Sequence, residues 1–432
     1  MDPGTTAHAL IDTEARGLLT RLDMVRPFVL NETMVVAACL PYDALVAIER
    51  FLHQERKRLR NKVKDFLSWL HREGRTASAA EQQRRFVILR LGFNNVLAQF
   101  DLFTEVVTQR SETQTGVWLS GLDVLAADAL RVDVAGRPDP SAVCYLARGA
   151  GAAIRRTRTR LPGGALNPVA VIRVPRERMI GSGIASSLIH EVGHQGVAQL
   201  GLVESLRRDL TEAAKRDAKG GWDVWYRWIS EIVADCWSVG TIGITSTVGL
   251  LAVVSLPSFF VFRPSGNDPH PMPYLRVLVS TSIGQALYPH PQWAAMRNTW
   301  KSLYPIAAVP QEIRAAVERC EATIGPFVEL LLNHRSDSLG DRALGEIWPT
   351  SHRQPAQLLL LHKQWNGDFG VMARQRPSLV FAVIGQAKAS GLLSAERESA
   401  LLQDLLSAWA VRSSLDVTTT YRPLASGSRR AS

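Results

Sequence analysis

The residues of this chain best suited to chemistry form an H-E-x-x-H motif made of His190, Glu191 and His194. On a helix, residues four apart share a face at roughly 5 to 6 Å, so both imidazoles can reach one metal ion. Glu191 then points toward the open side of that metal. A catalytic zinc takes three protein ligands and a water, and a nearby carboxylate can accept a proton from that water. The motif therefore predicts a catalytic zinc site that needs a third protein ligand.

The sequence around the motif favours a helix that begins near Ser182 and stops near Gly201. Ser182 is a suitable N-cap, and Ile184, Leu188 and Val192 form an apolar stripe at positions i, i+4 and i+8. Glycine commonly follows the last turn of a helix. The histidines lie away from the apolar stripe. We therefore expect them to face something other than the main apolar contact of the helix.

A second segment with helical character, residues 222–237, carries two carboxylates four residues apart, Glu231 and Asp235. The two side chains share one face of such a helix. The carboxylate of Glu231 can complete a His, His, Glu zinc shell. Asp235 can accept the spare ring N–H of a ligand histidine and so fix the tautomer and orientation of that ring.

His270 lies between two prolines in the segment 267–276. The prolines favour an extended or turned loop, which can present the side chain. A histidine beside the metal could donate a hydrogen bond to the oxyanion of a tetrahedral intermediate. A histidine in a proline-rich turn is also often a surface residue with no such role.

In chain order, the motifs H-E-x-x-H, E-x-x-A-D and H-P-x-P-x-x-R resemble those of the gluzincin metallopeptidases. They look most like the branch that contains the CAAX prenyl proteases and the HtpX-like heat-shock proteases, where the segment between the second histidine and the glutamate is long and variable. Here the step from His194 to Glu231 is 37 residues. The resemblance covers about residues 168–290. It departs from the family in two ways, because Ser230 stands where thermolysin-like relatives have Asn and the sequence lacks the set of transmembrane segments of the membrane branch.

The resemblance implies zinc-dependent hydrolysis of peptide bonds in a polypeptide substrate, with Glu191 as the general base. The other roles that it implies are zinc ligation by His190, His194 and Glu231, orientation of a ligand by Asp235, transition-state stabilisation by His270 and support of the site by Arg276.

A β-branched segment bracketed by prolines, residues 168–175, precedes the motif helix. Prolines at both ends suggest an edge strand, because proline cannot donate to the ladder. In zinc proteases such an edge strand often holds an extended substrate by backbone pairing. On this interpretation Ala170, Val171 and Ile172 bind substrate, and an ordinary sheet edge is the alternative.

Amphipathic patterns predict helices over residues 51–70, 81–110 and 395–411. We therefore expect a mainly α fold with a small β-sheet, that is an α+β fold, in which helical regions flank a zincin-like core. The expected regions are a helical N-terminal region at 1–130, the metallopeptidase core at 131–290, a helical C-terminal region at 291–417 and a disordered tail at 418–432.

The composition is that of a globular chain with an excess of positive charge. The 432 residues carry a formal net charge of +10, and 46% of them are hydrophobic. Positive charge favours anionic partners, and basic clusters occur at residues 56–64 and 155–160. The alternative hypothesis is a non-catalytic interaction protein that keeps a structural zinc and binds nucleic acid or another anionic partner through its basic helices. For the peptidase, nucleic acid is not an obligate partner.

The four cysteines are far apart, and the N-terminus lacks the basic and apolar run of a secretory signal. Both features favour the cytoplasm. Residues 241–262 carry no charge over a length that could cross a bilayer. Their glycines, proline and hydroxyl side chains argue against a membrane span and favour a buried core helix followed by an apolar turn.

Overall fold

The described part of the chain forms two compact units, each treated by itself below. The computed structural model describes residues 3–132, 134, 142–149, 152–162, 164–176, 181–217, 221–264, 266, 268–340 and 342–421. Unit 1 comprises residues 1–116 and 155–171, and unit 2 comprises residues 117–154 and 172–432. The predicted mainly α fold with a small β-sheet is confirmed. The expected boundaries near residues 130 and 290 remain predictions.

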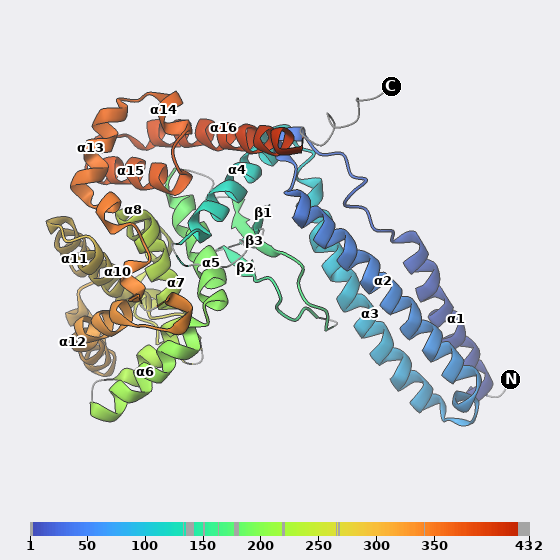
Figure 1. The fold of residues 1–432 in the computed structure, drawn as a ribbon. Coiled ribbons are helices and arrows are strands. Elements are labelled where there is room, and N and C mark those ends of the chain that lie inside the picture. Colours follow the sequence, from blue (N-terminus) through green and yellow to red (C-terminus); the bar gives the residue numbers. More distant parts are fainter. Residues whose placement is uncertain are drawn as a thin grey trace, which may run out of the picture. The chain divides into compact units, whose positions relative to one another are not determined.

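Unit 1 is built on three long helices that pack against one another (Figure 1). They are α1 (Pro3–Met24), α2 (Tyr42–His71) and α3 (Ala79–Thr108), with short 3-10 helices at Val36–Ala38 and Glu73–Thr76. The apolar positions predicted on α2, from Phe51 to Leu70, are buried. The amphipathic pattern of α2 therefore reports its packing face, as expected for a helix of this kind.

Unit 2 contains most of α4 and all the later helices. In chain order these are α4 (Thr113–Leu130), α5 (Gly183–Gln199), α6 (Leu202–Arg216), α7 (Trp222–Ile242), α8 (Ile244–Val254), α9 (Ser258–Val261), α10 (Pro273–Leu287), α11 (Pro291–Leu303), α12 (Gln311–Asn333), α13 (Pro355–Trp365), α14 (Phe369–Ala373), α15 (Pro377–Ala389) and α16 (Ala395–Tyr421). Further 3-10 helices are Ile306–Ala308, Asp337–Leu339, Leu344–Glu346 and Thr350–Arg353.

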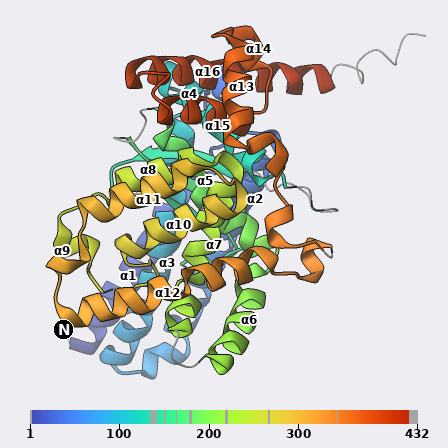
Figure 2. The same cartoon turned by 90° about the vertical axis from the view of Figure 1, so that its left-hand side faces the viewer.

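The centre of unit 2 is a group of packed helices around α7. Helix α5 packs on α7 and α8, while α10 contacts α7, α8, α11 and α12 (Figure 2). Trp225 and Trp237 of α7 are fully buried. Because α7 buries side chains on nearly all of its faces, it is a core helix, and its carboxylates Glu231 and Asp235 lie inside the unit.

The three described strands form one sheet in the order β1 (Ala142–Ala147), β3 (Ala170–Pro175), β2 (Ala153–Arg155). The expectation that residues 168–175 form an edge strand is therefore wrong. Strand β3 has a neighbour on each side, and Ala170, Val171 and Ile172 are buried. The continuous apolar run is typical of a central strand, and the prolines lie at or beyond the ends of the ladder, where a missing donor costs little. Strand addition by a substrate at these residues accordingly has no free side of β3 to use.

The charge-free stretch 241–262 is broken into short helices. Helix α7 ends at Ile242, Gly243 has φ 60°, and α8 runs for 11 residues with most of them buried. The expected buried helix is confirmed, followed by the short helix α9, where Phe259 is exposed. Among the described residues, α3 is the one helix long and apolar enough to cross a bilayer, a test that core helices also pass. The cytoplasmic location stays a prediction.

The C-terminal end of the described chain is helical beyond the expected limit. Helix α16 includes the predicted helix at 395–411 and continues to Tyr421. Residues 418–421, expected to belong to a disordered tail, are therefore helical. The rest of the expected tail, residues 422–432, lies outside the described part of the chain. All four cysteines are free thiols.

Candidate metal centre

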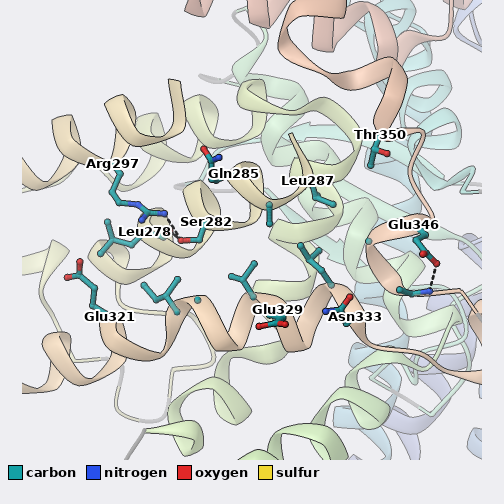
Figure 3. A pocket seen from close by; sticks show the side chains of 17 residues that line it. Leu278, Ser282, Gln285, Leu287, Arg297, Glu321, Glu329, Asn333, Glu346 and Thr350 are labelled. Carbon is teal, nitrogen blue, oxygen red and sulfur yellow. Dashed lines mark hydrogen bonds between the residues drawn. The ribbon is translucent and has the colours of Figure 1, made fainter. Parts of the chain in front are cut away.

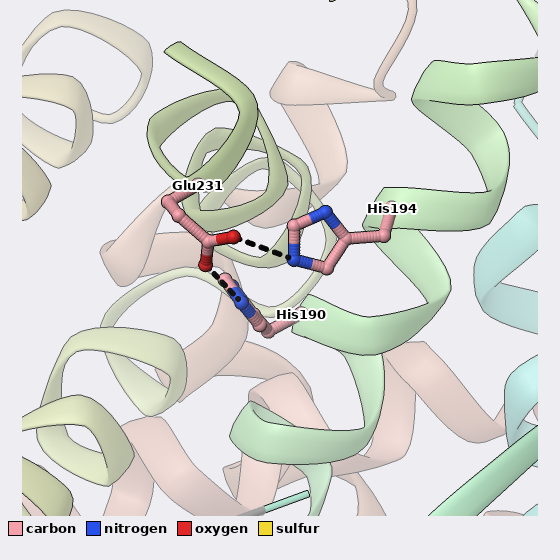
Figure 4. Close-up of side chains that lie close together, drawn as sticks. All are labelled: His190, His194 and Glu231. Atoms are coloured by element: carbon pink, nitrogen blue, oxygen red, sulfur yellow. Dashed lines mark ion pairs between the residues drawn. The ribbon is translucent and has the colours of Figure 1, made fainter. Parts of the chain in front are cut away.

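The predicted ligands converge between α5 and α7. One ligand atom each from His190, His194 and Glu231 lies within 4.8 Å of the others. His190 Nε2 is 3.3 Å from Glu231 Oε2, and His194 Nε2 is 3.5 Å from Glu231 Oε1 (Figure 4). The two imidazole rings lie 4.8 Å apart and almost perpendicular, at 83°. The i, i+4 spacing of the motif thus presents both histidines to one carboxylate across a 37-residue step.

Two glycines of α5 allow this close approach of the helices. A Cβ on Gly193 would lie 2.9 Å from the Cβ of Trp237, and a Cβ on Gly196 would lie 2.6 Å from the Trp237 ring. Carbon atoms in ordinary contact stay about 3.5 to 4.0 Å apart, so larger residues would push α5 away from α7. Trp237 is itself fixed by its indole N–H, which donates to the Ala129 carbonyl at 3.0 Å. The glycines therefore set the distance between the histidines and Glu231.

Asp235 and Arg276 lie behind His190 and fix its ring. The Nδ1 atom of His190 is 2.8 Å from Asp235 Oδ1. Arg276, from the first turns of α10, donates to both oxygens of Asp235 at 2.7 and 2.8 Å, and its Nη2 lies 3.4 Å from His190 Nδ1. A carboxylate that accepts the Nδ1 proton leaves Nε2 as the metal-binding atom. The structure thus brings together the three residues predicted as a ligand, an orienting carboxylate and a supporting arginine.

Electrostatics keep these buried groups charged. Burial alone would raise the pKa of Asp235, but Arg276 and His190 hold that pKa well below its usual range. Burial alone would lower the pKa of His190, but the Asp235 carboxylate raises it to about 9. Burial likewise opposes the charge of Glu231, whose pKa is nevertheless held far below normal by the two histidines. Since a metal needs a neutral imidazole, metal binding would release the His190 proton.

One buried atom in particular fits a metal ligand. Glu231 Oε2 is buried and accepts no hydrogen bond of suitable geometry within the described part of the chain. It faces His190 Nε2 at 3.3 Å and His270 Nε2 at 3.5 Å. Buried carboxylate oxygens are rarely left without a partner, so an unsatisfied one calls for an explanation. Two imidazole nitrogens and one carboxylate oxygen are a donor set that zinc and related transition metals accept.

His270 reaches the same centre from the loop before α10. Its side chain is 55% exposed, which makes it the most solvent-accessible of the histidines at the site. Asp268 accepts from the His270 backbone N–H at 3.0 Å, and its Oδ1 lies 2.6 Å from His270 Nδ1. These hydrogen bonds lower the pKa of Asp268 and direct Nε2 toward Glu231. Sequence reasoning gave Asp268 no role, although an Asp two residues before a His is a typical turn pattern.

Glu191 occupies the expected position on α5 but makes no close contact that assigns its role. It is 8% exposed, and its charge helps to raise the pKa of Arg276. Its assignment as the general base therefore stays a prediction from the motif.

The N-terminus of α5 is held by a residue that the sequence gave no reason to choose. Ser182 is the N-cap residue, as expected, but its side chain makes no cap hydrogen bond within the helix. Its backbone N–H donates to Glu398 Oε1 of α16 at 3.1 Å, and its hydroxyl donates to the same oxygen. Glu398 is fully buried and also pairs with Lys388 at 2.5 Å. A carboxylate from a distant helix thus replaces the local cap. The expected stop is confirmed, because α5 ends at Gln199 and Gly201 has φ 62°.

A separate cavity of about 740 Å³ lies beside α10 (Figure 3). Residues of α10, α11, α12 and the segment 343–350 line it, including Leu278, Arg297 and Glu329. None of the predicted site residues contributes to its wall. The cavity and the metal centre are therefore distinct features of unit 2.

No protein-family model, curated protein or solved structure matches this chain.

Proposed function

We propose that this protein is a zinc-dependent metallopeptidase with a gluzincin-like site. The observation that carries the proposal is the convergence of His190, His194 and Glu231, with the unsatisfied Oε2 of Glu231 directed at the histidines. Asp235 behind the ligands and His270 in front of them occupy places suited to the roles that the motif resemblance implies. The substrate class is a polypeptide.

In the proposed hydrolysis of a peptide bond, each residue of the site has a separate role. Zinc bound by the three ligands would supply Lewis-acid activation of the water and of the scissile carbonyl. Glu191 takes a proton from the attacking water and passes it to the leaving amine as the C–N bond breaks. His270, held by Asp268, donates a hydrogen bond to the oxyanion that forms on the carbonyl oxygen. Asp235 and Arg276 hold His190 in position throughout.

The competing hypothesis, a non-catalytic zinc protein that binds anions through its basic helices, has less support on α2. Arg60 and Arg56 both pair with Asp23, the latter at 3.6 Å, and Arg58 pairs with Glu55 at 3.3 Å. These two carboxylates offset two of the six positive charges of the basic cluster at residues 56–64. A closed structural zinc site also gives Glu191 no function, because such sites have no open position for water.

The test combines metal analysis with a cleavage assay. Purified wild-type protein is expected to hold about one zinc per chain, and Glu231→Ala to hold much less. Glu191→Gln should keep the zinc and lose about 10²- to 10⁴-fold of the cleavage rate on fluorescein-labelled casein. Glu204→Gln, on the exposed surface of α6, is the matched control and should change neither value. Absence of stoichiometric metal in the wild type, or an unchanged metal-dependent rate in Glu191→Gln, would refute the proposal.

A further inference from the structure

The second basic cluster of the sequence differs from the first, because its arginines lie on a hairpin and none of them pairs with a carboxylate among the described residues. From Pro140 through Arg176 the chain has seven arginines and no aspartate, glutamate or lysine. Four of these arginines are 155, 156, 158 and 160, all of them exposed and all part of unit 1. We call residues 155–167 the arginine hairpin.

Backbone hydrogen bonds connect the described residues of the arginine hairpin. The N–H of Arg158 donates to the Asn167 carbonyl at 2.9 Å, and the N–H of Asn167 donates to the Thr159 carbonyl at 2.9 Å. A β-bridge joins Arg160 to Leu166. The side-chain amide of Asn167, itself buried, donates to the backbone carbonyls of residues 155 and 156 at 2.9 and 3.0 Å. The arginines are therefore presented by a fixed scaffold, which reduces the entropy lost on binding a ligand.

These arginines have no carboxylate partner among the described residues. Arg155 donates instead to the side-chain oxygen of Gln99 on α3, and Arg160 to the carbonyl of Gly164 at 3.5 Å. Arg58 of α2, which pairs with Glu55, approaches the hairpin, because its guanidinium lies 3.4 Å from the place that a Cβ on Gly164 would occupy. Positive charges crowded without anions repel one another, and a bound polyanion would relieve that repulsion.

The chemistry of the hairpin favours phosphates along a duplex backbone. Arginine offers a planar fork that matches phosphate oxygens. Phe, Trp and Tyr are absent from residues 146–221, so no ring is at hand in this segment to stack on the bases of a single strand. Leu161 is buried, and Leu166 is the one large apolar side chain that the described hairpin exposes, which is little to insert into a lipid surface. We propose that the arginine hairpin binds the phosphate backbone of a nucleic-acid duplex without reading its base sequence.

The test measures salt-dependent binding of a fluorescein-labelled duplex of 20 base pairs to the full chain by anisotropy between 50 and 200 mM NaCl. Each arginine on a phosphate contributes about one to the slope of log K against log salt. Arg158→Gln/Arg160→Gln should lower the slope by about two and weaken binding at 50 mM salt by at least about tenfold. The control Arg16→Gln/Arg84→Gln removes the same charge from unit 1, but these arginines already pair with Asp12 and Glu81. It should change the slope by much less.

Several outcomes would overturn the proposal. They are no binding of the duplex at 50 mM salt, an equal loss in the control variant, tighter binding of a single strand of the same length, or binding to phosphatidylserine-containing vesicles in place of the duplex. Circular dichroism checks that each variant is folded. Should the double variant be misfolded, Arg156→Gln alone is expected to lower the slope by about one. The inference is independent of the peptidase, so duplex binding should persist in Glu191→Gln.

Discussion

The candidate metal centre and the arginine hairpin differ in whether their charged side chains have partners of opposite charge. At the candidate metal centre Asp235 is buried and the Arg276 side chain is 13% exposed, and the two opposite charges are hydrogen-bonded at 2.7 and 2.8 Å. On the hairpin the arginines are exposed and no described carboxylate pairs with them. Desolvating an unpaired ion costs several kcal/mol, whereas an exposed ion keeps its water. A charged side chain in the buried site therefore needs an opposite charge beside it. An exposed arginine does not, and it can bind an anionic ligand instead.

The largest expected effect comes from removing one member of the buried pair. Arg276→Met leaves the Asp235 carboxylate buried without its partner and should lower the free energy of unfolding by about 3 to 5 kcal/mol. Zinc affinity should also fall by about 10- to 100-fold, because His190 loses its orientation. Urea unfolding and a competitive zinc titration measure the two effects. Arg227→Met, an exposed partner of Asp223, is the control and should cost less than about 1 kcal/mol.

A smaller effect is expected at the exposed side of the metal centre. Asp268→Asn removes the charge that holds His270 and should lower kcat by about 10- to 100-fold with little change in KM. Zinc content should stay the same, because neither residue is a ligand. An unchanged kcat with zinc bound would show that His270 acts without Asp268, or not at all.

The next smaller effect on the free energy of unfolding is expected from the carboxylate of Glu398 that caps α5. Glu398→Gln keeps the shape of the side chain but loses the charge that Ser182 and Lys388 share. We expect a loss of about 1.5 to 3 kcal/mol in the free energy of unfolding. The exposed neighbour Glu396 offers the matched variant Glu396→Gln, expected to change stability by under about 0.5 kcal/mol. Equal effects of the two variants would contradict the capping role.

Acid should destabilise unit 2 through Asp235. Its pKa in the folded protein lies below the ordinary value of 3.8, so the folded state binds fewer protons than the unfolded state. The contribution of Asp235 to the free energy of unfolding is therefore complete above about pH 5. It is lost as the pH falls through 3.8 toward the lower pKa of Asp235 in the folded protein. We expect a loss on the order of 1 to 2 kcal/mol by pH 3. Urea unfolding of the metal-free protein from pH 6 to pH 3 measures it. The loss should be smaller in Asp235→Asn.

The smallest effect on stability is expected on the hairpin. Replacing Arg158 and Arg160 with Gln breaks no ion pair among the described residues and should change the free energy of unfolding by less than about 0.5 kcal/mol. A slight gain is consistent with relief of repulsion. A loss of more than about 1 kcal/mol would show that these arginines stabilise the fold, and the contrast with the metal centre would then fail.

Local patterns were enough to find the helices of the site and the residues that converge there. The apolar period of three to four residues located α2, α5 and α16, and the spacing of His190, His194, Glu231 and Asp235 selected the ligand types. The four-residue spacing within each helix is a local property, so it can be recognised without knowing the fold. The order of strands is not local, which is why the prolines flanking β3 suggested an edge that the sheet does not have.

The sequence by itself therefore determined where the helices lie along the chain and which side chains share one face of a helix. Only the tertiary structure decided which faces meet. It brings α5 against α7 at Gly193, and it places Glu398 at the N-terminus of α5. It also lets Arg56 and Arg60 share Asp23, while the hairpin arginines pair with no carboxylate in the described part of the chain. The physical reason is that periodicity fixes the direction of a side chain relative to its own helix. Its partner depends on the packing of residues distant in the chain.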